Sequence, residues 1–155
     1  MKKGCFEKAH QLWADYVRAK YALLGAGFIR SFRSTEAEFA EWLVAAIFNG
    51  RLPNNKANPA YDVIAGEKRI QVKSVTKMPD NKSGYEISKK DKLNDPTKGA
   101  THYAFVFFDE LIPDVVFFID EAFVRKFRKA EIRRRDLECA NCKVDIDLSI
   151  FRVHL

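Results

Sequence analysis

The first 50 residues show the three- and four-residue spacing of apolar side chains that is typical of amphipathic helices. One such pattern covers residues 5–24, and the glycines at 25 and 27 favour its end there. A second pattern begins after Thr35 and continues to Gly50. Because Glu38 follows Thr35 by three residues, we expect the two to form a capping box at the start of the second helix. The apolar positions of the first helix are Phe6, Ala9, Trp13, Tyr16, Val17 and Leu24.

The remainder of the chain favours strands with loops or helices between them. Two short alternating segments come first and, after a polar stretch at 80–99, two strongly apolar ones follow. A basic segment at 121–136 has helical spacing, and an alternating segment closes the sequence. The predicted strands are 60–65, 68–76, 101–110, 114–120 and 144–155. This order predicts a single α/β domain over residues 1–155, with a central mixed β-sheet of four or five strands flanked by helices.

Composition narrows the class of protein further. The hydrophobic share of 47%, with 13 phenylalanines, is enough to build a core, and the net charge of +6 favours polyanionic partners such as nucleic acid. The longest apolar runs, at 103–108 and 115–119, are too short to cross a bilayer. No signal-peptide pattern is present, and three cysteines argue against a disulfide framework. We therefore expect a soluble cytoplasmic protein with no membrane partner.

A tight turn at Gly66 and Glu67 predicts how the first two strands pair. Glycine at the first central position suits a type II′ turn, and counting outward places Asp62 opposite Gln71, with Cβ atoms about 5 Å apart. Because side chains alternate along a strand, Gln71 and Lys73 should share one face. That face would hold a carboxylate, an amide and an ammonium group, while the other face is apolar. The apolar set is Val63, Ile70 and Val72.

These polar groups suit a divalent cation. Carboxylate, amide and main-chain carbonyl oxygens are ligands that Mg²⁺ accepts while it keeps several waters. Asp62, Gln71 and the main-chain carbonyl of Val72 are therefore candidate ligands for Mg²⁺, with Mn²⁺ as an alternative. Lys73 could orient or deprotonate a metal-bound water and offset charge on a phosphate. The other interpretation is an ordinary surface ion pair between Asp62 and Lys73.

Together with the acidic helix before them, these residues resemble the PD-(D/E)XK nuclease superfamily. The matching pieces lie within residues 34–76 and are also similar to small bacterial proteins that share YD and QVKS. They are TEAEFAEWLVAAIFNG, NPAYDVI and IQVKS.

The resemblance implies a restriction-endonuclease-like fold in which Asp62 and Gln71 bind the metal and Lys73 is catalytic. It assigns the first-helix glutamate to Glu38 or, failing that, to Glu41 one turn later. It also implies metal-dependent hydrolysis of DNA, with RNA as the alternative substrate, that leaves a 5′ phosphate and serves restriction or defence. A homodimer would suit the cutting of both strands.

Gln71 departs from the superfamily pattern, which has Asp or Glu at that position. The change removes one negative charge, so it should weaken metal binding without preventing ligation by the amide oxygen. Two alternatives therefore stay open: a non-catalytic nucleic-acid-binding module that retains the fold, and a basic subunit that meets an acidic protein. For Glu38, a purely structural role as a cap is equally open.

Two basic stretches follow the hairpin and are candidate phosphate contacts. The segment 125–135 carries seven basic residues against one acid, and a helix there would expose them around most of its circumference. A solvated basic helix without a ligand is the alternative. The candidate nucleic-acid-binding residues are Lys89, Lys90, Lys92, Arg125, Arg128, Lys129 and Arg133.

Cys139 and Cys142 have the spacing of half a zinc site. The remaining cysteine and the three histidines are scattered singly along the sequence, whereas a structural zinc takes four ligands. The pair is therefore interpreted as buried or incidental thiols.

Overall fold

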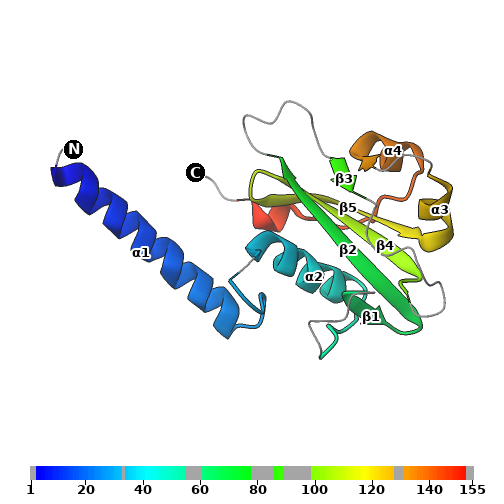
Figure 1. Ribbon diagram of the computed structural model, residues 1–155, viewed down its shortest axis with the longest axis horizontal. Helices are drawn as coiled ribbons and strands as arrows, with labels where there is room; N and C mark the ends of the chain where they lie inside the picture. The colour runs from blue at the N-terminus through cyan, green and yellow to red at the C-terminus, as the bar shows by residue number, and fades with distance from the viewer. Residues whose placement is uncertain are drawn as a thin grey trace.

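A mixed four-stranded β-sheet forms the centre of the structure (Figure 1). The structure is a computed structural model, and it describes residues 3–32, 34–54, 61–77, 86–88, 99–127 and 131–152. β1 is antiparallel to β2, β2 is parallel to β4, and β4 is antiparallel to β5. The strands, in spatial order, are β1 (Val63–Ala65), β2 (Lys68–Lys77), β4 (His102–Asp109) and β5 (Ile112–Asp120). The predicted α/β class, with a mixed sheet flanked by helices, is confirmed.

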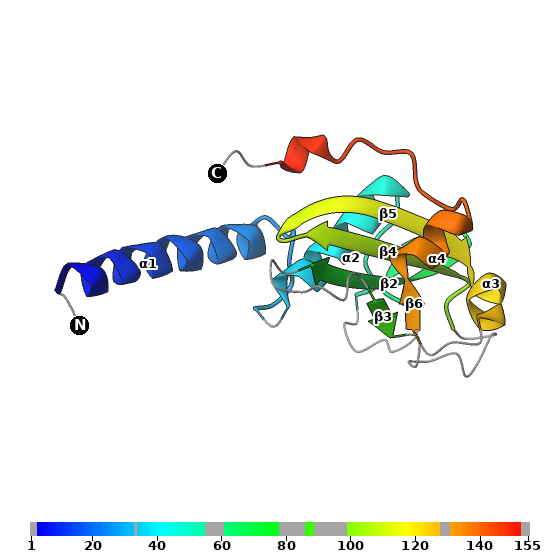
Figure 2. The ribbon, with the colours of Figure 1, turned by 90° about the horizontal axis from the view of Figure 1, so that it is seen from above.

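Helices cover both faces of this sheet. One face packs against α2 (Thr35–Ile47), and the other carries α3 (Glu121–Lys126), α4 (Arg134–Cys139) and a small second sheet. The second sheet pairs β3 (Glu86–Ser88) with β6 (Glu131–Arg133) in antiparallel fashion. The longest helix, α1 (Lys3–Gly25), extends away from the sheet in both views (Figures 1 and 2).

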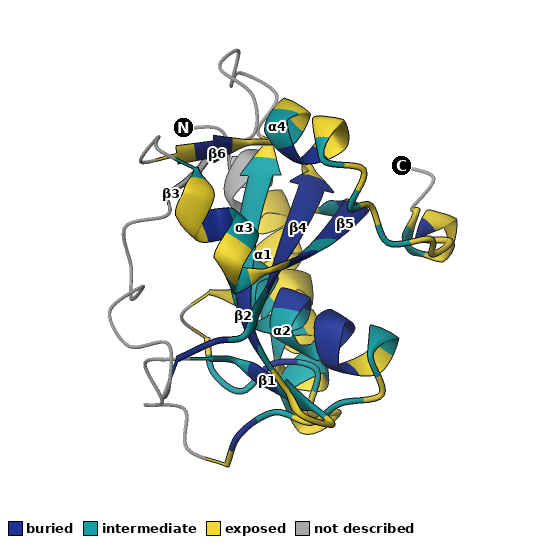
Figure 3. Cartoon of the chain, turned by 90° about the vertical axis from the view of Figure 1, so that its right-hand side faces the viewer, coloured by how far each residue is buried: buried dark blue, intermediate teal, exposed yellow. Residues whose placement is uncertain are grey.

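The alternation of side chains along β4 explains why its apolar run is continuous. Even-numbered residues such as Val106 pack with Leu43 and Val44 of α2, whereas odd-numbered residues such as Phe105 pack with Leu137 of α4. All residues from 103 to 108 are buried, as Figure 3 shows for β4. A strand covered on both faces needs apolar side chains at every position rather than at every second one.

Two predicted elements are wrong. The segment 121–136 does not form one helix, because Ile132 is buried in β6, where it pairs with Ile87 of β3. A new helix, α4, then begins where the Asp136 carboxylate accepts a hydrogen bond from the Arg133 N–H, 2.9 Å away. The segment 144–155 was predicted to be a strand, but the bridge to β5 is made by Lys143 just before it. The described part of the segment forms a short 3₁₀ turn, η1 (Ser149–Phe151).

The helices were expected to be too short or too polar to cross a membrane. None in the described ranges combines the length and apolar character that a bilayer crossing requires. α1 has 23 residues, but charged side chains recur along its length. It ends at Gly25, close to the predicted boundary, and Gly27 has a positive φ of 77° in the turn that follows.

Candidate active site at the β1–β2 hairpin

The predicted hairpin register is confirmed. Ala65 pairs with Lys68 and Val63 with Ile70, so the turn consists of two residues. Gly66 has φ 59°, the positive value that a type II′ turn needs at its first central position. Continued by one residue, this register places Asp62 opposite Gln71, as the sequence predicts.

The end of α2 is fixed against this hairpin. Main-chain hydrogen bonds of 2.8 and 2.9 Å join Arg51 and Ile64 in both directions. The approach is so close that a Cβ atom on Gly50 would lie 2.6 Å from the carbonyl oxygen of Ile64. Glycine is therefore required at this position, and the contact brings α2 to the edge of the sheet where β1 lies.

Asp62 immediately precedes β1. Its main-chain N–H donates to the Ile70 carbonyl at 2.9 Å, and its carboxylate turns toward β2. There it accepts one hydrogen bond from the Val72 N–H, at 2.8 Å, and another from the Gln71 side-chain amide. The Gln71 amide also lies 3.4 Å from the Val72 carbonyl oxygen. The Gln71 amide nitrogen thus lies within hydrogen-bonding distance of both other predicted metal ligands, the Asp62 carboxylate and the Val72 carbonyl oxygen.

The face that carries Gln71 and Lys73 is more enclosed than the hairpin pattern indicates. Gln71 is only 9% exposed, and Lys73 is half-buried. Gln71 pairs with Tyr103 and Lys73 with Phe105 in the parallel ladder to β4. Burial raises the pKa of Tyr103, and the charge of Glu121 on α3 adds to that shift. Groups of α3 therefore act electrostatically on the face that holds the candidate site.

The capping box predicted for Thr35 and Glu38 is wrong. Ser34 is the N-cap residue of α2, and the Thr35 hydroxyl is buried without a hydrogen-bond partner. The Glu38 carboxylate instead accepts hydrogen bonds from the main-chain N–H groups of Arg30 and Ser31 and from the Ser31 hydroxyl. The contact with the Ser31 N–H measures 2.7 Å. Glu38 therefore tethers the loop before α2, and these contacts do not join it to Asp62.

Glu41 is the α2 carboxylate that interacts with Asp62. Burial raises the pKa of Glu41, and the negative charges of Asp62 and, to a smaller degree, Glu38 add to the shift. Arg30 opposes the shift through an ion pair and a hydrogen bond with Glu41. Two carboxylates thus share a partly buried environment, in which both are charged only at an electrostatic cost.

Arg30 is a site residue that the sequence analysis missed. Its guanidinium group pairs with Glu41 and donates to the Pro53 carbonyl at 3.3 Å, while its Nε is buried without a hydrogen-bond partner. It thus links the loop before α2 to the loop after α2. Glu41 follows it by 11 residues across a turn, and no spacing rule connects two such positions.

Only part of the predicted nucleic-acid interface lies in the described ranges. Arg125 is exposed on α3, where it forms an ion pair with Glu121, and Arg133 is exposed on β6. The two lie on different elements, so the basic surface of one continuous helix does not form. The candidates that fall outside the described residues are Lys89, Lys90, Lys92, Arg128 and Lys129.

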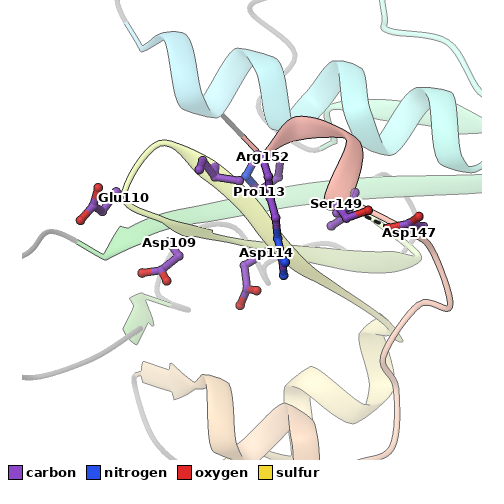
Figure 4. Close-up of a pocket in the computed structure, with 9 residues that line it drawn as sticks. Asp109, Glu110, Pro113, Asp114, Asp147, Ser149 and Arg152 are labelled. Carbon is purple, nitrogen blue, oxygen red and sulfur yellow. Dashed lines mark hydrogen bonds between the residues drawn. The ribbon is translucent and has the colours of Figure 1, made fainter. Parts of the chain in front are cut away.

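A cavity of about 480 Å³ lies at the far end of the sheet, where β4 turns into β5 (Figure 4). Gln71 pairs with Tyr103 and Lys77 with Asp109, so the cavity is six residues, or about 20 Å, further along the ladder. Its charged lining is mostly acidic and would repel a phosphate. The lining residues are Asp109, Glu110, Ile112, Pro113, Asp114, Asp147, Leu148, Ser149 and Arg152.

The two cysteines of the predicted half zinc site differ in their exposure to solvent. The Cys142 thiol donates to the Leu137 carbonyl at 3.4 Å, and burial raises its pKa, whereas Cys139 is exposed. No group of three or more His, Cys, Asp or Glu side chains that could hold a metal occurs in the part of the chain that the structure describes. Any metal at the hairpin would therefore depend on amide and main-chain oxygens as well as on Asp62 and Glu41.

Comparison with known proteins leaves the family open. Neither a scan against protein-family models nor a search of curated proteins finds a match to this chain.

Proposed function

We propose that the chain is a metal-dependent endonuclease that hydrolyses DNA phosphodiester bonds. One observation carries the proposal: the Asp62 carboxylate is hydrogen-bonded to the Gln71 amide and the Val72 N–H, and its charge acts on Glu41. Lys73 follows on the same strand and shares a face with Gln71. This arrangement brings together the groups that the superfamily resemblance selects, with Glu41 in the position of the first-helix acid.

The donor set fits a hard divalent cation. Asp62, Gln71 and the Val72 carbonyl would hold Mg²⁺ or Mn²⁺, with Glu41 contributing directly or through water. Burial and, after it, the negative charge of Asp62 raise the pKa of Glu41, and a cation between the two carboxylates would relieve their repulsion. For ligation, Gln71 must present its amide oxygen rather than its N–H groups toward Asp62, which a rotation about its terminal bond achieves.

Lys73 would act on the attacking water and on the phosphate. A bound divalent ion supplies a water of lowered pKa and neutralises charge on the phosphate oxygens. The Lys73 ammonium, two residues from Gln71, would orient that water and stabilise the negative charge that develops in the transition state. Arg125 and Arg133 are exposed on the elements that cover this face and would contact neighbouring phosphates.

A second candidate function is a binding module that retains this arrangement without catalysis. Gln71 supplies no negative charge, and Arg30 already neutralises Glu41 through an ion pair. Both features lower the affinity that the site would have for a cation. In this alternative, the net charge of +6 would support DNA binding in the absence of metal.

The test is a plasmid-cleavage assay run beside a gel-shift assay. The proposal predicts that supercoiled DNA becomes open-circular or linear with Mg²⁺ or Mn²⁺ and stays intact with EDTA, and that the new ends carry 5′ phosphates. DNA that stays intact under all conditions but shifts equally in EDTA would support the binding module and overturn the nuclease. If DNA is neither cut nor bound at moderate salt, both candidate functions fail.

A further inference from the structure

The helix α1 exposes large apolar side chains to solvent along much of its length. Trp13 is 66% exposed, Leu12 60%, Tyr21 61% and Tyr16 49%. Phe32, in the loop after the helix, is 45% exposed and packs edge-on against Tyr21, with ring centroids 5.0 Å apart. Figures 1 and 2 show that α1 points away from the sheet, so the sheet does not cover this surface.

The four of these side chains that belong to α1 lie on one side of the helix, and most of its charged side chains lie on the other. The exception is Lys20, whose ammonium group lies on the apolar side, over the rings of Tyr16 and Phe32. At 100° per residue, Trp13 and Val17 mark the centre of the apolar side, with Tyr16 and Tyr21 at its flanks. On the opposite side, Gln11 donates to Asp15 at 3.2 Å, and Arg18 forms an ion pair with Asp15. The polar side therefore has partners within the helix, while the apolar side faces water.

A helix of this kind is stable when its apolar side is covered. Isolated helices are marginal in water, and most helical stability in proteins comes from packing of the apolar face. An aromatic side chain buries about 150–250 Å² in a core, so the exposed parts of the five large side chains amount to roughly 500 Å² per copy. That area approaches the roughly 800 Å² per partner that a stable interface buries.

We propose that this apolar side of α1 packs against the same side of α1 in a second copy of the chain. A two-fold arrangement places identical surfaces together, so an apolar stripe is complementary to itself. Charge is compatible with this choice of partner: α1 contains two acidic and four basic side chains, a net charge of +2, whereas the whole chain has a net charge of +6. Its polar side carries acidic as well as basic side chains, so it lacks the polybasic face that favours an anionic membrane surface.

The surface beside the stripe offers places for the partner's side chains. A hollow of about 310 Å³ is lined by Trp13, Tyr16, Val17, Lys20, Tyr21 and Phe32. A second, of about 320 Å³, lies where the helix meets the body of the protein and includes Leu23, Phe39 and Phe151 in its lining. Packing of helices inserts side chains of one into hollows of the other, and both hollows adjoin the stripe. The inference does not depend on the proposed nuclease activity.

The test is sedimentation velocity of the full chain from about 1 to 100 µM, with two variants of α1 that each add one positive charge. Trp13→Lys alters the apolar side, and Gln11→Lys, two residues earlier, alters the polar side. The proposal predicts a wild-type mass of twice 17.9 kDa. Because a central aromatic side chain in an interface typically contributes at least 2 kcal/mol, Trp13→Lys should weaken dimerisation by about 30-fold or more. Gln11→Lys should leave it within about twofold.

Three results would overturn the inference. The first is a wild-type chain that stays monomeric across the whole range. The second is a dimer that both variants weaken equally or not at all, since another surface would then form it. The third is a monomer that binds anionic lipid vesicles and loses that binding in Trp13→Lys, since a membrane would then be the partner. Far-UV circular dichroism of both variants checks that α1 remains helical.

Discussion

Replacement of Asp62 separates the structural role of its carboxylate from its proposed chemical role. The carboxylate accepts hydrogen bonds from the Val72 N–H and the Gln71 amide, and Gln71 is only 9% exposed. Asp62→Asn keeps one oxygen acceptor of the same shape but removes the charge. Asp62→Ala removes the carboxylate oxygen that accepts both hydrogen bonds, so two partly buried donors lose their acceptor. The two variants should therefore be equally inactive and unequally stable.

The magnitudes follow from the two hydrogen bonds. A buried donor left without an acceptor costs about 1–3 kcal/mol, so the loss of two such bonds in Asp62→Ala should lower the free energy of unfolding by about 2–6 kcal/mol. In Asp62→Asn, one acceptor remains and the repulsion with Glu41 disappears, so we expect a loss of about 1 kcal/mol. For a chain of this size, 1 kcal/mol corresponds to about 2–4 °C in Tm, so the alanine variant should melt several degrees lower.

The assay combines thermal unfolding in EDTA with calorimetric titration of Mn²⁺ into each protein. Both variants should lose Mn²⁺ binding and DNA cleavage relative to wild type. If the two variants had equal Tm values, the hydrogen bonds to Val72 and Gln71 would not stabilise the protein. If Asp62→Asn kept wild-type Mn²⁺ binding, Asp62 would not be a metal ligand.

Three further predictions concern neighbouring groups. Gln71→Glu restores the acid of the superfamily pattern, so it should tighten Mn²⁺ binding. Because it adds a third carboxylate beside Asp62 and Glu41, it should also lower the Tm in EDTA. An unchanged Mn²⁺ affinity would exclude position 71 as a ligand. Because the folded-state pKa of Glu41 is raised, its ionisation costs stability as the pH rises through that pKa, and Glu41→Gln should gain stability over wild type between pH 4 and 7 in urea titrations. Parallel pH curves would contradict this. Burial lowers the pKa of His102, whose ring stacks on Phe118. As the pH falls below the unfolded-state pKa of 6.5, the wild type should therefore lose stability that His102→Phe does not lose. Equal losses in the two proteins would contradict this prediction.

Local rules predicted the hairpin well. The two-residue turn at Gly66 and Glu67 set the register, and the register set which side chains meet at Asp62. The apolar runs that became β4 and β5 were also recognisable, because a strand covered on both faces is apolar at nearly every position.

Contacts between residues far apart in the sequence determine the features that sequence patterns did not predict. Glu38 had the spacing of a capping box, yet its carboxylate binds the loop at Arg30 and Ser31, which only the fold brings near it. The segment 121–136 has helical spacing, but the pairing of β6 with β3 and the burial of Ile132 outweigh that local preference. Arg30 was missed for the same reason, since its partners Glu41 and Pro53 lie 11 and 23 residues away.

The most direct measurement is the rate of DNA cleavage by Lys73→Ala at saturating Mn²⁺, compared with wild type and with Lys77→Ala. Lys77 lies four residues further along β2, so the control removes an exposed ammonium from the same strand and face. The account predicts that Lys73→Ala retains Mn²⁺ binding but cleaves at least about 100-fold more slowly, the usual scale of acid–base catalysis. Lys77→Ala should stay within about twofold of wild type. Equal rates for Lys73→Ala and wild type would contradict the assignment of the hairpin as the catalytic site.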